Sequence, residues 1–167
     1  MRKQYALLVI LFLIFQTGAQ ARIPRFSKVS DGFYRGGQPT DREDYVSLKS
    51  LGIRTVVNLR TTVSEVVVEE SILRELGIEM VHIPISTVFG PSRRDLAQVF
   101  EVLLEEKDGP VFLHCQEGKD RTGLVVGLYR NQLQNFSCKQ AWHEMKQNGF
   151  NPFLLSLTSY FWNHCEP

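Results

Sequence analysis

A cysteine and an arginine, Cys115 and Arg121, are separated by five residues between two apolar segments. The first segment, residues 111–113, is expected to be a buried strand, and residues 122–134 are expected to form a helix. A tight turn from a strand into a helix N-terminus points successive backbone N–H groups into one concavity, which suits an anion. These amides, Arg121 and the helix dipole favour the thiolate form of Cys115. A thiolate facing a phosphate is a nucleophile set against phosphorus, so the pattern predicts phosphatase chemistry.

The motif His114-Cys115-x-x-Gly118-x-x-Arg121-Thr122, here called the signature loop (residues 114–122), resembles the loop of the cysteine-dependent protein-tyrosine and dual-specificity phosphatases. Residues 33–39 and 52–60 resemble the opening of a small atypical dual-specificity branch, and the resemblance runs from about Ser30 to Gly127. Members of that branch act on tyrosine phosphate or on inositol phosphates and pyrophosphates. The resemblance implies a phosphomonoester hydrolase that forms a phospho-cysteine intermediate.

The signature loop supplies the residues expected to perform the reaction. Cys115 is the expected nucleophile, and the planar fork of Arg121 suits a bidentate clamp on two phosphoryl oxygens. By family resemblance, Thr122 donates a hydroxyl hydrogen bond to the thiolate and helps it leave in the second step. His114 is expected to hold the shape of the loop through its ring nitrogens rather than to transfer protons.

The backbone between Cys115 and Arg121 is expected to bind the phosphate. Its N–H groups would stabilise charge on the equatorial oxygens. A glycine at position 118 permits a backbone angle that a β-carbon would oppose. In similar lipid phosphatases, a lysine at the next position meets a second phosphate. The expected phosphate-binding residues are Gln116, Glu117, Gly118 and Lys119.

The general acid is the point at which the chain departs from the family. The usual acid is an aspartate on a separate loop before the cysteine, but residues 83–90 contain no carboxylate. Asp120 is the first candidate, because a Lys-Asp pair before the arginine resembles bacterial and phosphoinositide-directed phosphatases. Asp95 is the alternative, although its place near a helix N-terminus also suits the helix dipole. A third reading needs no protein acid, because the leaving group is already acidic, as in a phosphoanhydride.

Several cations are expected around the phosphate site. Arg93 and Arg94 lie on a facing loop, and Arg35 and Arg60 end segments near the same edge. Together with Lys119 they predict a basic rim that favours a small polyphosphorylated substrate. Inositol polyphosphates, as for a phytase, therefore rank first, phosphotyrosine peptides second and phosphoinositide lipids third. A sulfur-transfer enzyme and a catalytically weak phospho-ligand binding module are the rival readings.

The first residues predict a cleaved secretory signal peptide, residues 1–21, followed by a single phosphatase domain, residues 22–167. Arg2 and Lys3 precede an apolar run at residues 6–15, and Ala19-Gln20-Ala21 suits cleavage. The run is short for a membrane span, so no stable membrane insertion is expected after cleavage. Removing these two cations from the net charge of +1 leaves −1, which gives no basic field for nucleic acid. We expect an exported protein, periplasmic or secreted, and a monomer.

Three cysteines fit an oxidising compartment. Cys115 has a chemical role, which leaves Cys138 and Cys165 to form a disulfide with each other. His143 and His164 lack ligand-like spacing with any Cys or carboxylate pair, so neither a metal nor a cofactor is expected.

Apolar strands alternate with amphipathic helices along the rest of the chain. Strands are predicted at residues 29–35, 53–59, 79–85 and 111–113, and helices at 40–51, 63–76, 92–107, 122–134, 137–147 and 152–162. The helix at 40–51 is expected to begin with Thr40 as its N-cap and Glu43 completing a capping box. This alternation predicts an α/β fold with a mainly parallel central sheet flanked by helices on both faces. The signature loop then lies at the carboxyl end of a strand, where such sheets carry their sites.

Overall fold

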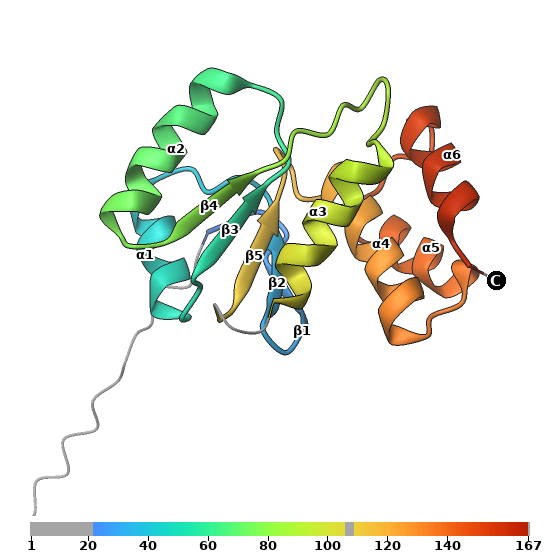
Figure 1. The fold of residues 1–167 in the computed structure, drawn as a ribbon, viewed down its shortest axis with the longest axis horizontal. Coiled ribbons are helices and arrows are strands. Elements are labelled where there is room, and N and C mark those ends of the chain that lie inside the picture. The colour runs from blue at the N-terminus through green and yellow to red at the C-terminus, as the bar shows by residue number, and fades with distance from the viewer. Residues whose placement is uncertain (1–21, 106–108, 167) are drawn as a thin grey trace, which may run out of the picture.

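The computed structural model describes residues 22–105 and 109–166, so the predicted signal peptide lies outside the described residues (Figure 1). In chain order the elements are β1 (Ser27–Ser30), β2 (Phe33–Gly36), α1 (Arg42–Ser50), β3 (Thr55–Asn58), α2 (Val63–Glu75), β4 (Glu79–His82), α3 (Arg93–Leu104), β5 (Val111–His114), α4 (Asp120–Gln134), α5 (Cys138–Gln147) and α6 (Leu155–His164).

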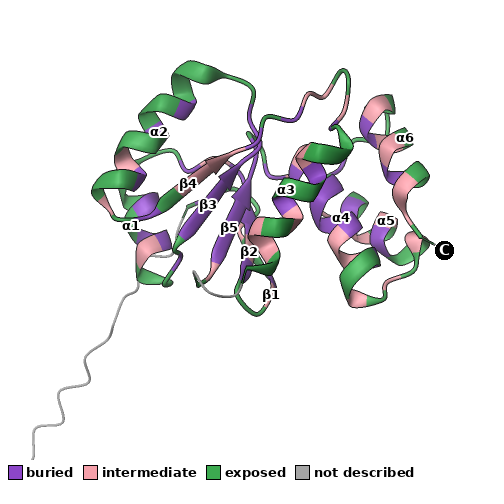
Figure 2. Ribbon diagram, viewed as in Figure 1, coloured by how far each residue is buried: buried purple, intermediate pink, exposed green. Residues whose placement is uncertain are grey.

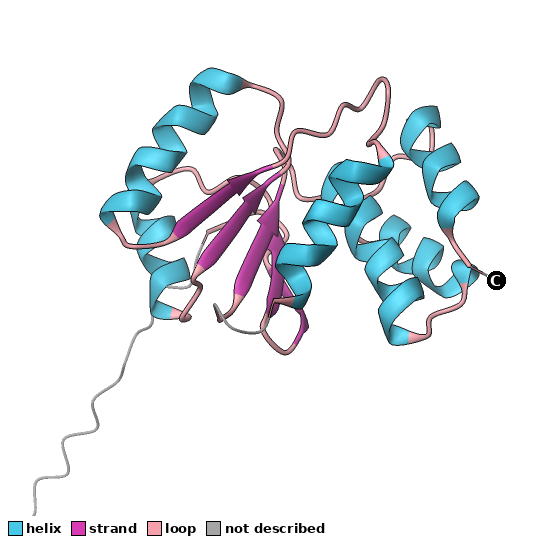
Figure 3. Cartoon of the chain, in the orientation of Figure 1, coloured by secondary structure: helices cyan, strands magenta, loops and turns pink. Residues whose placement is uncertain are grey.

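The strands form one sheet in the order β1-β2-β5-β3-β4, with β5 in the middle (Figure 3). The pairs β2–β5, β5–β3 and β3–β4 are parallel, and only β1 runs antiparallel to its neighbour. His114 on β5 is in register with Gly36 on β2 and with Asn58 on β3. The predicted α/β fold with a mainly parallel sheet is confirmed, and the loops that follow these three strands begin side by side.

Helices cover both faces of the sheet, α1 and α2 on one side and α3 to α6 on the other (Figure 1). Because strand residues alternate between faces, Val56 and Phe112 pack toward α1 and α2, whereas Val57 and Leu113 pack toward α3 and α4. The central strands are buried along their length (Figure 2), as a parallel sheet covered on both faces requires.

Two predicted elements near the N-terminus are corrected. The single strand predicted at residues 29–35 is a hairpin, in which Gly32 takes a left-handed φ of 72° between β1 and β2. The helix predicted from Thr40 begins at Arg42, because Asp41 is its N-cap and accepts the N–H of Asp44 at 3.0 Å. Thr40 instead donates its own N–H to the Asp44 carboxylate at 3.0 Å.

Boundaries farther along the chain shift by smaller amounts. The strand predicted at residues 79–85 ends at His82, although Ile83 and Ile85 beyond it are buried. A continuous apolar run therefore does not show where the chain leaves the sheet. The helix α3 ends at Leu104, and residues 106–108 lie outside the described residues.

A disulfide joins Cys138, at the start of α5, to Cys165, which follows α6. Asn131 on α4 donates to the carbonyl of Glu166 at 2.8 Å and so also holds the C-terminal segment. Over the ranges 22–105 and 109–166, none of the helices has the length and apolar character that crossing a membrane requires.

Candidate active site

The signature loop leaves β5 at the carboxyl edge of the sheet, and the loops after β2 and β3 support it. The N–H of Leu59, after β3, donates to the His114 carbonyl at 2.9 Å. On the other side, the N–H of Gln38, after β2, donates to the Gln116 carbonyl at 3.1 Å. The loop is therefore held from both sides by the strands that flank β5.

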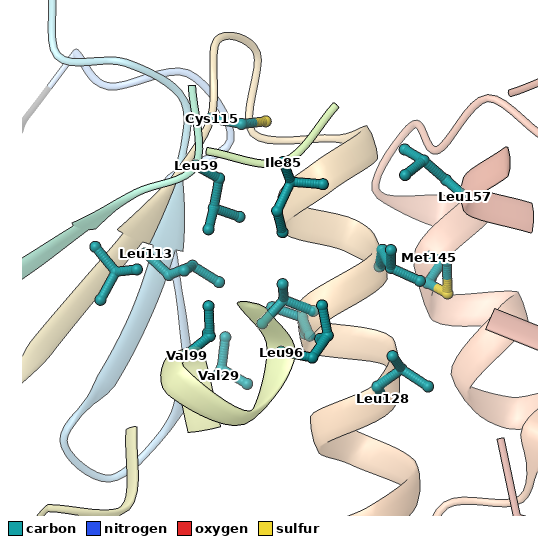
Figure 4. Packing of buried hydrophobic residues seen from close by; sticks show 14 of the residues in the cluster. Val29, Leu59, Ile85, Leu96, Val99, Leu113, Cys115, Leu128, Met145 and Leu157 are labelled. Atoms are coloured by element: carbon teal, nitrogen blue, oxygen red, sulfur yellow. The ribbon is translucent and has the colours of Figure 1, made fainter. Parts of the chain in front are cut away.

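Cys115 is the one free cysteine among the described residues, and only 2% of its surface is exposed. It lies at the end of the apolar core, beyond Leu59 and Ile85 (Figure 4). The hydroxyl of Thr122, in the first turn of α4, is buried and has no hydrogen-bond partner among the described residues. That hydroxyl is therefore available for the bond to the thiolate that the family resemblance implies.

Gly118 is the residue whose conformation closes the signature loop. Its φ is +72°, and a β-carbon there would lie 2.4 Å from the backbone carbon of Gly36. Both the left-handed angle and the close approach of the β2 loop therefore require glycine.

Arg121 belongs to the first turn of α4 and is partly buried. Its Nη1 donates to the carbonyl of Leu59 at 3.3 Å, which orients the guanidinium against the loop after β3. The signature loop thus brings a buried thiol, a guanidinium and a helix N-terminus together, which is an arrangement for binding and attacking a phosphoryl group.

A buried polar group lies behind the signature loop. Nε2 of His114 lies 3.1 Å from Oε1 of Glu69, and both side chains are almost completely buried. The other oxygen of Glu69 accepts from Asn58 at 2.5 Å. Burial alone would raise the pKa of Glu69, but the interactions with His114 and Asn58 outweigh it and hold the pKa below its ordinary value. The neighbour of the His114 ring on this side is therefore the buried carboxylate of Glu69.

Two arginines of the predicted basic rim are almost completely buried. Only 2% of Arg35 and 4% of Arg60 is exposed, because β2 and β3 carry them into the interior. Arg35 donates to the Gly118 carbonyl at 2.7 Å, so it lies beneath the signature loop. Arg60 forms an ion pair with Glu65 and donates to Gln38 at 3.0 Å.

The remaining cations of the predicted rim are accessible to different degrees. Lys119 is paired with Glu117 at 2.8 Å, and this contact raises the pKa of Lys119 and lowers that of Glu117. Arg93 and Arg94 are exposed at the start of α3. Only part of the predicted rim therefore remains free to meet a polyanion.

The two candidate acids have different surroundings. Asp120 is the first residue of α4, and its Oδ1 accepts the N–H of Asn151 at 2.8 Å, which orients the carboxylate and holds the loop between α5 and α6 against the signature loop. Asp95 closes a capping box with Ser92, whose N–H donates to the Asp95 carboxylate at 2.7 Å. Asp95 is thus already engaged at the helix N-terminus, which matches the dipole role that its position suggested.

A cavity of about 560 Å³ opens beside the signature loop. Gln116 links it to the loop, and α1, α2 and the segment between β2 and α1 form its other walls. Its lining consists of Gln38, Pro39, Thr40, Asp41, Arg42, Tyr45, Arg60, Ser64, Glu65, Val68, Glu69, Ile72 and Gln116. A substrate with its phosphate in the signature loop has room to extend here.

Sequence reasoning missed two residues at the site. Glu69 lies on the buried face of α2, three residues after Val66 and four before Leu73. A carboxylate at a buried helix position needs a polar partner, so this spacing could have marked Glu69 in the sequence. Arg25 donates to the Glu117 carbonyl at 3.0 Å from the segment before β1, and no local pattern marks it. In the part of the chain that the structure describes, no three His, Cys, Asp or Glu residues are grouped as metal ligands.

The fold and the signature loop define the class of cysteine-dependent phosphatases, with the loop after the central strand of a mainly parallel sheet. A profile of the family described as "DSP-PTPase phosphatase fused to NAD+ Kinase" matches residues 19–158. The chain belongs to this family of dual-specificity-type phosphatases.

Curated relatives agree with the family. The chain is 30% identical over 138 residues to the dual specificity protein phosphatase TpbA of Pseudomonas aeruginosa, which covers 79% of this chain and 59% of TpbA. It is 31% identical over 133 residues to the inositol diphosphatase DSP3 of Arabidopsis thaliana, covering 74% of this chain and 61% of DSP3. The chain thus spans about three fifths of the length of these relatives.

Solved structures share the fold. The core catalytic domain of the PP-IP phosphatase SIW14 from S. cerevisiae superposes with a TM-score of 0.73 at 22% identity, covering 87% of this chain and 88% of that one. TpbA from P. aeruginosa superposes with a TM-score of 0.71, also at 22% identity, over 84% of each chain.

Proposed function

We propose that this protein is a cysteine-dependent phosphatase that hydrolyses inositol polyphosphates, including their diphosphate groups. One observation carries the proposal. The signature loop provides Cys115 and Arg121 for phosphoryl transfer, while the neighbouring loop after β4, residues 83–90, contains no carboxylate. A leaving group that is itself a phosphate is acidic enough to depart without a protonating side chain, which suits this composition.

The reaction follows from the residues of the signature loop. The Cys115 sulfur attacks phosphorus, the bond to the leaving-group oxygen breaks, and a phospho-cysteine forms. Arg121 and the loop amides neutralise the charge on the equatorial oxygens. Water then attacks phosphorus, inorganic phosphate leaves, and the Thr122 hydroxyl stabilises the departing thiolate. Asp120 would supply a proton where the leaving group is a poor one.

Both the relatives and the geometry support this substrate class. DSP3 is named an inositol diphosphatase, and SIW14 a PP-IP phosphatase. In this chain, Arg93 and Arg94 are exposed, and the 560 Å³ cavity begins at Gln116, next to the phosphate loop. Both features are candidate contacts for the further phosphates of a compact ligand held in the signature loop.

Phosphotyrosine peptides are the second candidate, because the loop after β4 presents apolar side chains. Val88 and Phe89 are exposed, Phe89 by 89%, and Ser156 anchors this loop by donating to the Thr87 carbonyl at 2.7 Å. Such side chains can pack against apolar residues of a peptide. TpbA has been crystallised in complex with pTyr.

We also propose that the protein acts after export, in the periplasm or outside the cell. The basic start, apolar run and small-residue site of residues 2–21 support this location. The Cys138–Cys165 disulfide supports it independently, because such bonds persist in oxidising compartments.

The test is phosphate release by residues 22–167 from an inositol diphosphate, inositol hexakisphosphate and a phosphotyrosine peptide, with Cys115→Ser as the control. A higher kcat/KM for the inositol substrates supports the proposal, and a higher value for the peptide replaces it with the second candidate. Binding of inositol hexakisphosphate without turnover, and with no difference in Cys115→Ser, would make the protein a binding module.

A further inference from the structure

Three successive carbonyl groups of the signature loop are held from outside the loop. Each accepts one hydrogen bond from a different segment of the chain. The pairs are Gln116 with the N–H of Gln38 at 3.1 Å, Glu117 with Nη1 of Arg25 at 3.0 Å, and Gly118 with Nη2 of Arg35 at 2.7 Å.

A planar trans peptide turns its carbonyl and the following N–H to opposite sides. A donor that holds the Glu117 carbonyl outside therefore turns the N–H of Gly118 inward, and one on the Gly118 carbonyl does the same for the N–H of Lys119. These N–H groups belong to the set that would meet the equatorial oxygens of a bound phosphate.

We propose that Arg25 and Arg35 are positioning residues of this phosphatase, which fix the signature-loop amides toward the phosphoryl group by binding the carbonyls behind them. The inference rests on the proposed phosphatase function and adds two arginines that act through the backbone. Neither guanidinium needs to contact the substrate.

The guanidinium of Arg35 loses its contact with water in order to bind the Gly118 carbonyl. It is 2% exposed, and its Nε and Nη1 have no hydrogen-bond partner among the described residues. Burial lowers the pKa of Arg35 to about 10, so it remains protonated at neutral pH. Burying a cation whose hydrogen-bond partner is one backbone carbonyl costs free energy of desolvation. The hydrogen bond that Arg35 makes to this carbonyl is charge-assisted and therefore strong.

Arg25 reaches the loop from the segment before β1. Its φ is 53°, a left-handed angle that a residue with a β-carbon rarely adopts. The N–H of Gly37 donates to the carbonyl of Pro24 at 2.7 Å and fixes this segment beside the signature loop. Because Arg25 is exposed, its removal tests the positioning role with little effect on folding.

The experiment compares each arginine with a matched control. Arg25→Ala is paired with Arg22→Ala, an exposed arginine of the same segment. Arg35→Met and Arg35→Lys are paired with Arg74→Met, because Arg74 is an arginine of α2 that is ion-paired with Glu70 rather than bound to the loop. The readouts are kcat/KM for p-nitrophenyl phosphate, the inhibition constant of inorganic phosphate, the pH profile and the melting temperature.

Arg35→Met should weaken phosphate binding and lower kcat/KM by about 10-fold to 100-fold, somewhat less than the loss of a whole oxyanion donor. Arg25→Ala should lower the affinity for phosphate and kcat/KM by about 3-fold to 10-fold, since an exposed hydrogen bond contributes less than a buried one. Arg35→Lys should recover part of the loss, Arg25→Ala should keep the midpoint of the pH profile, and Arg22→Ala and Arg74→Met should leave the inhibition constant and kcat/KM unchanged.

Unchanged phosphate inhibition in both Arg25→Ala and Arg35→Met would overturn the proposal. A shifted pH midpoint with unchanged phosphate inhibition would overturn it too, because Arg35 would then act on the Cys115 thiolate by charge. If Arg35→Met fails to fold, Arg25→Ala still decides. Failure of the proposed function has a different signature, because the wild-type chain itself would release no phosphate.

Discussion

Replacing Glu69 by glutamine removes the buried carboxylate that faces the His114 ring and leaves the rest of the site in place. Oε1 of Glu69 lies 3.1 Å from Nε2 of His114, and the other oxygen accepts from Asn58 at 2.5 Å. Removing the partner of a buried polar group leaves that group unsatisfied and costs about 1–3 kcal/mol. Glutamine keeps an oxygen for Asn58, so we expect a loss of about 2 kcal/mol in the free energy of unfolding.

The pH dependence of that loss identifies its cause. The pKa of Glu69 in the folded state lies below its ordinary value of 4.5, so its ionised form stabilises the fold. This contribution is complete above the ordinary pKa and is lost as the pH falls through the lower pKa of the folded state. The difference between wild type and Glu69→Gln should therefore be largest near neutral pH and shrink in acid.

Urea unfolding at a series of pH values measures this difference, with Glu70→Gln as the control. Glu70 is the next residue on α2, and its carboxylate forms an exposed pair with Arg74 at 3.3 Å, which is worth at most about 0.5 kcal/mol. A Glu69→Gln variant as stable as Glu70→Gln near neutral pH would refute the reasoning. So would a difference that does not change with pH.

Three further predictions concern other parts of the molecule. Gly118→Ala should abolish turnover, because its β-carbon would lie 2.4 Å from the Gly36 backbone at a left-handed φ; a melting curve and a phosphate-release assay check this. Replacing both Cys138 and Cys165 by alanine removes a bridge across a sequence separation of 27 and should cost about 3–4 kcal/mol in unfolding free energy, with kcat unchanged at room temperature. If Asp120 is the acid, Asp120→Asn should slow hydrolysis of an inositol monophosphate by about 10²–10⁴-fold and barely affect p-nitrophenyl phosphate; equal effects on both would remove it from that role.

Local spacing was enough to predict the signature loop. Cys115, Gly118 and Arg121 lie within one turn between a strand and a helix, so their types and separations already specify an anion-binding loop. The parallel α/β fold was predictable for a similar reason, since alternating apolar strands and amphipathic helices leave few other topologies. The hairpin of β1 and β2 was missed because its turn at Gly32 interrupts an alternation that also fits one strand.

The surroundings of the loop were not predictable from spacing. Arg35 and Arg60 were expected on a basic rim, yet register in the sheet buries Arg35 under Gly118 and turns Arg60 toward Glu65. A charged residue at a strand end is exposed or buried according to what packs over it, and no local pattern contains that information.

The sequence by itself determined the family and was enough to predict Cys115 as the nucleophile and Arg121 as the clamp, because these depend on residues that are neighbours along the chain. Only the tertiary structure decided which residues support them. Arg25 reaches Glu117 across 92 positions, and Glu69 on α2 meets His114 on β5. Such contacts exist only after β2, β5 and β3 align at one edge, because parallel pairing sets the register that brings distant segments to the same loop.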